Sequence, residues 1–506
     1  MSGISKSQWI KYLFLSSLGR ADDCPPKTGP YQDYPYFRKS SLEEIRGFWK
    51  KTLELIDTGR APKEIGIYIH WPFCPSQCTF CHCSMTVPNG DVGMKAYAHA
   101  LKEEMDAFSD VFRNHAFGSV YIGGGTPTFM LDEELSSLLN HVRSRFRLTP
   151  GAQFYVETSP ATLTESKLQT LIFHGVNRVT LGVQSLDDGI VSGVNRVGQS
   201  RKKVEYILRS LLSLPLIVDV DLMMGLPGQS TLSFLRDLYS MVKIGPQVIH
   251  VYSYDSRPQT LASRFHKRLE GIDWKDSDAV RLAADRILKS SGYRQSNWVP
   301  GEDIDNPLEE RQDGSLRKFG ASVLGFGLAA KSHAFGSCWY EHRPIALAKS
   351  SMGRIPPYFC FESNLEEEMR HYAVRNLSRF HHIDRSDFRR IFHKDVVEHE
   401  PLATIISQLE RLKIISVDSR EICWKITDIL SRQVLLRKFY SPSLVSALVG
   451  YYEKERARFY EVYDKSSVNL EENIRRKISD FYFQRVYYRE SSPLKTQGFQ
   501  KYHALS

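Results

Sequence analysis

Short apolar runs alternate with amphipathic helical patterns from about residue 64 to residue 255. A short apolar run bounded by turn residues is typical of a buried strand, and apolar residues three or four apart are typical of a helix. The predicted strands are EIGIYIH, SVYIGGGTP, QFYVETSP, RVTLGVQS, LIVDVDLMMGLP and VIHVYSYD. Strands separated by helices build a parallel sheet with helical crossovers. The pattern therefore predicts the α/β class and a partial (β/α)6 barrel, open where an eight-repeat barrel would close.

Five of these strands carry a polar or glycine-rich signal at or just after their C-terminal end. In parallel sheets, ligands bind at the edge where the carboxyl ends of the strands meet. We therefore expect the functional residues at that edge.

The rest of the chain divides into further segments. A helix is predicted to begin at a capping box, Ser41-x-x-Glu44, before the core. Short helices and a small strand pair late in the chain predict a mostly helical, winged-helix-like domain, followed by a basic tail with helical periodicity to about residue 485. The expected boundaries are 1–63 for an N-terminal extension, 64–300 for the core barrel, 301–364 for a core extension or linker with a glycine-rich run, 365–440 for the C-terminal domain and 441–506 for the tail.

Composition narrows the class of protein. Hydrophobic residues make up 42% and charged residues 25% of the 506 residues, which is typical of a soluble globular protein. No apolar run approaches the ~20 residues of a membrane span, and the start lacks the order of features of a signal peptide. We expect a cytoplasmic protein. The net charge of +9 is spread along the chain, so it indicates a solvated basic surface or attraction of a small anionic substrate rather than nucleic-acid binding.

Four of the chain's 8 cysteines lie within ten residues, in the stretch IHWPFCPSQCTFCHCSM. Cys74, Cys78 and Cys81 have the spacing C-x3-C-x2-C and follow a predicted strand. A structural zinc site usually takes two ligand pairs from separate segments, and no matching second pair follows here. Three thiolates on one loop suit a cubane iron–sulfur cluster with one iron left open. A zinc knuckle, or cysteines that only pack, are the alternatives.

This loop resembles the signature of the radical S-adenosylmethionine superfamily. The resemblance implies a 4Fe-4S cluster on Cys74, Cys78 and Cys81, whose open iron chelates S-adenosylmethionine. It further implies a 5′-deoxyadenosyl radical that removes a hydrogen atom from the substrate, chemistry that the cofactor carries.

Five motifs narrow the resemblance: YIHWPFC, GGGTPT, GVNRVTLGVQSLDD, VNRVG and DLMMGLPGQS. Together they resemble the oxygen-independent coproporphyrinogen III oxidase (dehydrogenase) subfamily over roughly residues 60–435. That subfamily binds two S-adenosylmethionine molecules. The resemblance implies that Tyr68, Gly124 and Glu157 surround the first molecule, with Tyr68 beside the sulfonium as the residue nearest the chemistry. The resemblance also implies a set of residues around the second molecule: Phe80, Gly125, Thr126, Gln184, Arg196 and Asp221.

The chain departs from the subfamily pattern at two positions that we expect near the cofactors. Asp255 replaces a small residue near the second molecule, and Lys331 replaces an apolar residue in the glycine-rich run. The branch of haem chaperones has histidine at the position of Lys331. Cys83 matches a fourth cysteine of the porphyrinogen enzymes, although three thiols already serve the cluster, so we do not expect it to be a ligand.

The resemblance leaves three reactions open. The first is oxidative decarboxylation of the propionates of coproporphyrinogen III in porphyrin biosynthesis. The second is radical methyl transfer or cyclopropane formation in a natural-product pathway, which Asp255 and Lys331 favour. The third is haem trafficking without turnover. We expect an anionic tetrapyrrole or another small molecule as substrate, a flavodoxin- or ferredoxin-like electron donor, no nucleic acid and a monomer.

Overall fold

The computed structural model describes most of the chain from residue 38 onward, and the statements below refer to that part. The described residues are 38–81, 83–254, 274–295, 322–342, 357–379, 381–426, 432, 435–444 and 485–489.

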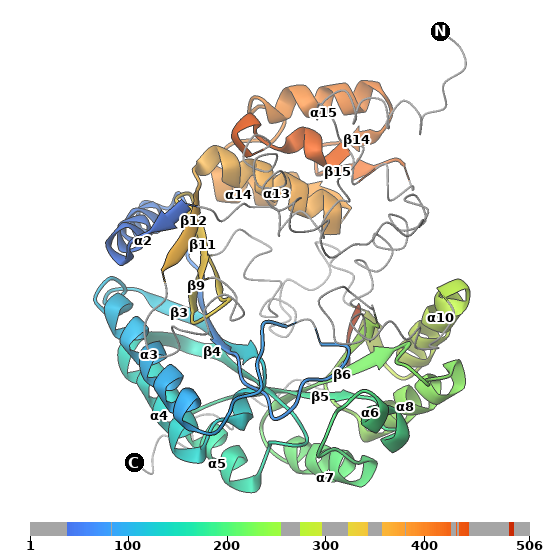
Figure 1. Cartoon of the computed structure of the whole chain (residues 1–506). Coiled ribbons are helices and arrows are strands. Elements are labelled where there is room, and N and C mark those ends of the chain that lie inside the picture. Colours follow the sequence, from blue (N-terminus) through green and yellow to red (C-terminus); the bar gives the residue numbers. More distant parts are fainter. Residues whose placement is uncertain are drawn as a thin grey trace, which may run out of the picture.

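Parallel strands in chain order form the middle of one large sheet (Figure 1). The order β2-β3-β4-β5-β6-β7 confirms the predicted set of six repeats. The strands are β2 (Ile65–Trp71), β3 (Ala116–Gly124), β4 (Arg147–Thr158), β5 (Arg178–Gln184), β6 (Ile217–Met224) and β7 (Val248–Ser253). The connecting helices are α3 (Val92–Ser109), α4 (Asp132–Arg145), α5 (Glu165–Phe173), α6 (Asp188–Gly193), α7 (Arg201–Leu212) and α8 (Thr231–Ile244).

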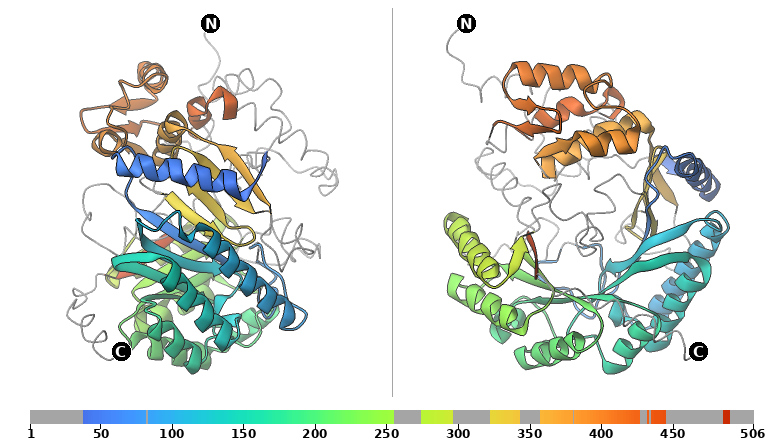
Figure 2. Two further views of the ribbon diagram at one scale, coloured as in Figure 1. Left: turned by 90° about the vertical axis from the view of Figure 1, so that its left-hand side faces the viewer. Right: turned by 180° about the vertical axis from the view of Figure 1, so that it is seen from behind.

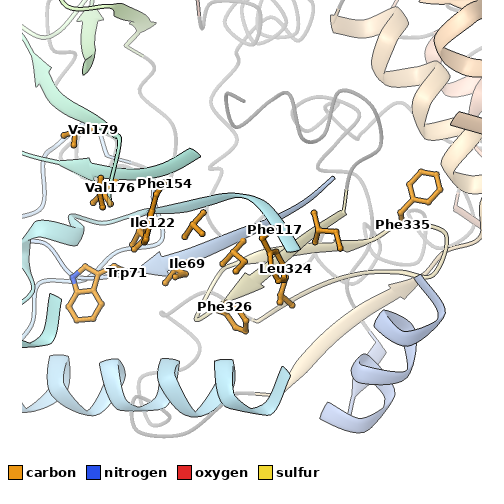
Figure 3. Close-up of a cluster of buried hydrophobic side chains, with 14 of the residues drawn as sticks. Ile69, Trp71, Phe117, Ile122, Phe154, Val176, Val179, Leu324, Phe326 and Phe335 are labelled. Carbon is orange, nitrogen blue, oxygen red and sulfur yellow. The ribbon is translucent and has the colours of Figure 1, made fainter. Parts of the chain in front are cut away.

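The helices cover the outer face of this curved sheet (Figures 1 and 2). Side chains alternate between the two faces of a strand, and one face of the parallel strands carries apolar residues buried in the core, as Val218, Val220 and Leu222 are in β6. Figure 3 shows part of this layer, with Ile69 and Trp71 of β2 and with Phe326 of the later segment labelled. Burial of this apolar layer is the main stabilising contribution to the barrel.

Polar side chains from several of the parallel strands occupy the opposite, inner face. Arg178 and Asp219 are almost fully buried and form an ion pair between β5 and β6, with Arg178 Nε 2.9 Å from Asp219 Oδ2. His250 of β7 contacts the same carboxylate. Burial favours the neutral acid, but Arg178 and His250 hold the pKa of Asp219 below its usual value. The inner face is therefore charged where the outer face is apolar.

The segment around the glycine-rich run extends this sheet beyond β2 instead of forming a linker. β9 (Ser322–Phe326) pairs parallel with β2, and β10 (Lys331–Ala334), β11 (Cys338–His342) and β12 (Tyr358–Glu362) continue it antiparallel. The N-terminal strand β1 (Arg38–Ser40) pairs with β12. Helix α2 (Leu42–Asp57) begins at the predicted capping box, Ser41 and Glu44, and Trp49 of α2 donates to the Tyr340 hydroxyl at 2.7 Å.

The other edge of the sheet contains a strand from the tail. After α10 (Trp274–Ser290), β8 (Tyr293–Gln295) is separated from β7 by β16 (Arg485–Arg489), which pairs antiparallel with both strands. The predicted helical periodicity ends at about residue 485, where this strand begins, and β-branched and aromatic residues such as those of RVYYR favour a strand. Residues 445–484, which hold most of the predicted helix, lie outside the described part.

A small helical unit lies across the open side of the barrel (Figures 1 and 2). The strand pair predicted in this region is present as β14 and β15. A third strand, β13, joins them in the sheet β13-β15-β14. His333 of β10 bonds Glu368 of this unit, with Nε2 2.9 Å from Oε1. Its elements are α13 (Leu365–Arg379), β13 (His382–Asp384), α14 (Arg385–Phe392), α15 (Leu402–Arg411), β14 (Ile415–Val417), β15 (Glu421–Trp424) and the 3-10 turn η3 (Arg437–Phe439). Among the described helices, none is long and apolar enough to cross a membrane.

We predict that the Arg178→Met variant loses about 3–5 kcal/mol of unfolding free energy, because it leaves a buried carboxylate without its cation. Arg201→Met is the matched control, since Arg201 pairs with Glu205 on an exposed helix surface and should cost less than about 1 kcal/mol. Urea denaturation followed by circular dichroism measures both. Similar stabilities for the two variants would contradict the importance of the buried pair.

Candidate functional site

The loop that contains the clustered cysteines directly follows β2. The Cys74 amide donates to Thr86 O at 3.1 Å, which closes the loop at its base, and the Cys81 amide donates to Cys78 O at 3.1 Å. The far side of the loop is attached to the segment before α7, where the Asn195 side chain donates to Gln77 O at 2.9 Å. The loop is thus held from both sides, at the C-terminal ends of β2 and β5.

Each of two thiols on this loop has a polar neighbour from another element. Cys74 Sγ lies 3.2 Å from Thr126 Oγ1, and Cys78 Sγ lies 3.7 Å from Nη1 of Arg196. Burial raises the pKa of Cys74 to about 12 and also raises the pKa of Cys78. A hydrogen bond with Cys83 lowers the pKa of Cys81 to about 7. Cys74 and Cys78 therefore become thiolates readily only when a positive group such as a metal binds them, whereas the thiol of Cys81 ionises more easily.

The donor set fits a cluster better than a single ion. Three thiols from one loop face the Arg196 guanidinium, whose charge favours bound thiolates. A cubane with three cysteine ligands takes them from one short motif of this kind. Cys74, Cys78 and Cys81 are therefore the candidate ligands of a cluster.

The glycine loop after β3 packs directly under the cysteine loop. The Gly125 amide donates to Trp71 O at 2.6 Å, and the Thr126 amide donates to Phe73 O at 2.9 Å. A Cβ on Gly125 would lie 2.7 Å from Phe73 O. Gly124 has φ +108°, and a Cβ there would lie 2.6 Å from Cε1 of His70. Only glycine, which has no Cβ, lets the backbone of the glycine loop come this close to the end of β2 and the cysteine loop. The glycine loop and the cysteine loop therefore form one packed unit.

Tyr68, Gly124 and Glu157 lie together, as predicted for the first molecule. Glu157 Oε2 accepts from the Gly124 amide at 3.1 Å, and its other oxygen accepts from the Tyr121 hydroxyl. The Tyr68 ring packs 5.3 Å from the Tyr121 ring, and its hydroxyl lies 2.9 Å from His70 Nδ1. Burial lowers the pKa of His70 to about 4, so this histidine is neutral at pH 7.

The residues predicted for the second molecule gather around the end of β5. Arg196 donates to Gly182 O and, through Nε, to Gln199 Oε1 at 2.9 Å. Gln184 follows at a bulge in β5 with φ +68°, a conformation unusual for a residue with a side chain. A Cβ built on Gly182 would lie 3.1 Å from Nη2 of Arg196 and 3.3 Å from Nε2 of Gln184. Arg196 and Gln184 therefore meet beside the cysteine loop.

Asp221 and Phe80 complete the predicted second set. Asp221 pairs with Gly182 of β5 in the sheet register. Burial raises the pKa of Asp221 to about 6 and neighbouring Asp219 adds to this, while His250 and Arg196 oppose it. The carboxyl is thus mostly ionised at pH 7 and about half neutral near pH 6. Phe80 packs against the apolar cluster of Ile190, Val194, Met223 and Leu226.

Of the two departures from the subfamily pattern, the structure describes Lys331. Lys331 begins β10, opposite Glu341 of β11, so it belongs to the antiparallel extension and not to the six parallel strands. Asp255 lies outside the described residues.

Several inner-face residues escaped the sequence analysis: His70, Tyr121, Tyr155, Arg178, Asp219 and His250. These residues left a visible signal in the sequence, since Arg178, Asp219 and His250 are polar residues at the start of or inside apolar strand segments. Their pairing depends on the register between β5, β6 and β7, which the sequence does not reveal.

Comparison with known proteins finds the superfamily that the cysteine loop resembles. The family model of the Radical SAM superfamily matches residues 68–237. The oxygen-independent coproporphyrinogen III oxidase of Bradyrhizobium diazoefficiens is 28% identical over 318 residues, which cover 60% of this chain and 69% of the relative. The haem chaperone HemW of Buchnera aphidicola is 26% identical over 231 residues, which cover 46% of this chain and 61% of the chaperone.

A solved structure shares the fold over most of the chain. Coproporphyrinogen III oxidase (HemN) from Escherichia coli, whose structural report calls it a radical SAM enzyme, superposes with a TM-score of 0.64. The superposition covers 81% of this chain and 96% of that chain, at 20% sequence identity. The predicted fold class and the predicted resemblance are confirmed.

We predict that Gly125→Ala destabilises the joined loops, because the added Cβ would overlap Phe73 O and force the cysteine loop to move. We expect a loss of about 1–3 kcal/mol in stability and a lower iron content after reconstitution. Gly118→Ala is the control, since a Cβ there meets no atom within 4 Å. Thermal unfolding and iron analysis measure both variants. An unchanged iron content in Gly125→Ala would contradict the view that the two loops act as one unit.

Proposed function

The chain carries a radical SAM domain and is similar to oxygen-independent coproporphyrinogen III oxidases, and from this premise we propose that it oxidatively decarboxylates the propionate side chains of a coproporphyrinogen III-type substrate. The observation that supports this most is the position of Arg196. It lies against Cys78 and also against Gly182 and Gln184. The residues expected around a second S-adenosylmethionine are thus adjacent to the thiols expected to hold the cluster.

The superfamily implies a 4Fe-4S cluster and S-adenosylmethionine, which together supply a 5′-deoxyadenosyl radical that removes a hydrogen atom from the substrate. Cys74, Cys78 and Cys81 would hold the cluster. Glu157 would accept hydrogen bonds from ribose hydroxyls, and the amides of the glycine loop would orient the methionyl group. Tyr68 would flank the sulfonium. These residues bind and orient, and the loops around them exclude water from the reacting atoms.

A second S-adenosylmethionine would be held by Arg196, Gln184 and Asp221. The Arg196 guanidinium suits a carboxylate, and the ionised Asp221 suits an ammonium or ribose hydroxyls. Phe80, Gly125 and Thr126 would complete this subsite. The binding of two S-adenosylmethionine molecules is part of the proposal. It would serve oxidative decarboxylation and radical methyl transfer alike.

In the proposed reaction, a propionate that reacts loses one hydrogen atom to the 5′-deoxyadenosyl radical and then carbon dioxide and one electron, which passes to an external one-electron acceptor, and it becomes a vinyl group. The substrate is a polycarboxylate, which agrees with the net charge of +9. A flavodoxin- or ferredoxin-like donor would reduce the cluster. The described cysteines are free thiols, which agrees with a reducing, cytoplasmic setting. We propose that the monomer is the active form.

Radical methyl transfer to an sp2 carbon, or cyclopropane formation, is the second candidate. It would use the same cofactor residues. Lys331 favours it, because this cation begins β10 where the porphyrinogen enzymes have an apolar residue. Haem trafficking is the third, in line with the haem chaperones among the relatives, but Lys331 replaces the histidine of that branch.

The deciding experiment is anaerobic incubation of the reconstituted protein with S-adenosylmethionine, a reductant and coproporphyrinogen III, followed by mass spectrometry. We expect loss of carbon dioxide from the porphyrinogen together with 5′-deoxyadenosine. Cleavage of S-adenosylmethionine with an unchanged porphyrinogen would reject this substrate. Accumulation of S-adenosylhomocysteine would then favour methyl transfer.

Single cysteine variants test the cluster assignment. Cys74→Ala, Cys78→Ala and Cys81→Ala are each expected to abolish the iron-dependent absorbance and the cleavage of S-adenosylmethionine, since a cubane with one open iron needs all three thiolates. Cys83→Ala is the matched control on the same loop and should retain the cluster. Loss of the cluster in Cys83→Ala would show that the ligand set is wrong.

A further inference from the structure

A row of contacting side chains crosses the inner face of the sheet, with one residue from each of the strands β2 to β7. The Tyr68 and Tyr121 rings lie 5.3 Å apart, and the Tyr121 and Tyr155 rings stack at 4.6 Å. The Arg178 guanidinium lies 4.9 Å from the centre of the Tyr155 ring. Arg178 then pairs with Asp219, and Asp219 with His250. The row therefore begins beside the first predicted subsite and ends at His250.

His250 differs from the other members of this row. The residue is 7% exposed, and its Nε2 lies 3.2 Å from Asp219 Oδ2. Its second ring nitrogen, Nδ1, is buried and has no hydrogen-bond partner among the described residues. Buried polar atoms without a hydrogen-bond partner are rare in folded proteins, and where they occur they often have a functional role.

The contact with Asp219 orients the ring and its second nitrogen. An ionised carboxylate only accepts hydrogen bonds, so Nε2 of His250 carries the hydrogen. When the ring is neutral, Nδ1 has a lone pair that can accept a hydrogen bond. Because the two ring nitrogens diverge, Nδ1 faces away from Asp219. Asp219 and Arg178 thus hold the imidazole in one tautomer and one orientation.

His250 lies next to the residues proposed for the second S-adenosylmethionine. His250 is the register partner of Asp221 on the neighbouring strand, and Asp221 is in turn the partner of Gly182, which contacts Arg196. Tyr252, two residues further along β7, stacks with the His250 ring at 6.1 Å and packs against the cluster that includes Phe80. His250 therefore lies at the same level of the sheet as the subsite.

We infer that His250 is a ligand-binding residue whose Nδ1 accepts a hydrogen bond from an N–H or O–H group of a molecule bound on the inner face. Two sources carry such a group: the ammonium or ribose hydroxyls of the second S-adenosylmethionine, and the pyrrole N–H groups of a porphyrinogen. The inference rests on the proposed function for the identity of these ligands. Arg178 and Asp219 act through His250 as positioning residues.

The test uses the full-length protein with its reconstituted cluster under anaerobic conditions. Equilibrium dialysis measures the binding of S-adenosylmethionine, and fluorescence quenching measures the binding of coproporphyrinogen III. We expect His250→Phe to weaken the binding of one ligand about tenfold, the size of a lost hydrogen bond. Weaker binding of S-adenosylmethionine alone would identify it as the donor, and weaker binding of the porphyrinogen alone would identify the pyrroles.

His174→Phe is the matched control. His174 is also 7% exposed, but its Nε2 bonds the Ser136 hydroxyl at 2.9 Å outside the sheet. This variant should bind both ligands within twofold of the unaltered protein. Iron content and thermal midpoint report whether each variant keeps its cluster and its fold.

His250→Gln is the second variant, and it decides the question if His250→Phe does not fold. Its amide can still donate to Asp219 and leaves the Arg178–Asp219 pair intact, but the imidazole is lost, so we expect the same ligand to bind at least threefold more weakly. Binding of both ligands within twofold in the variants that fold would overturn the inference. If the unaltered protein binds no porphyrinogen, the proposed substrate fails, and the dialysis with S-adenosylmethionine alone decides the role of His250.

Discussion

The pairing of Arg178 with Asp219 is the constraint on which the inner face depends. Both side chains are almost completely removed from water, and such charges are tolerated only when they are paired and hydrogen-bonded. The pair joins β5 to β6, and His250 extends it to β7. A slip of one residue in either register would turn these charges into the apolar layer under the helices. The pair therefore fixes the register that places Gly182, Asp221 and His250 side by side.

A second constraint links the two loops at the edge of the sheet. The amides of Gly125 and Thr126 donate to the carbonyls of Trp71 and Phe73, so the end of β3 supports the start of the cysteine loop. Asn195 and Arg196 support the loop from the other side. The thiols are thus positioned by three strand ends that are far apart in sequence. This explains why a loop of little regular structure can present a defined set of ligands.

The sequence predicted the local and repetitive part of this arrangement. Period-2 strands, helical crossovers and the capping box at Ser41 depend on neighbouring residues, and all appear in the structure. The placement of β1 against β12 and of β16 between β7 and β8 was not predictable, because such pairings join segments hundreds of residues apart. For the same reason the motifs identified Arg196 and Asp221, while His250, an isolated histidine in a strand, acquires its meaning only from the register of β6 and β7.

Porphyrinogen oxidases and haem chaperones both appear among the relatives, so the residues expected to serve the shared cofactor cannot decide between their functions. A fold and a cofactor site host different reactions, and the difference lies in the residues that meet the substrate. In this chain Lys331 and His250 lie on opposite sides of the six parallel strands, on β10 and on β7. Neither belongs to the cysteine loop or the glycine loop. Under the proposed function, the residues that distinguish one reaction from another would therefore lie outside the two loops expected to serve the cofactor.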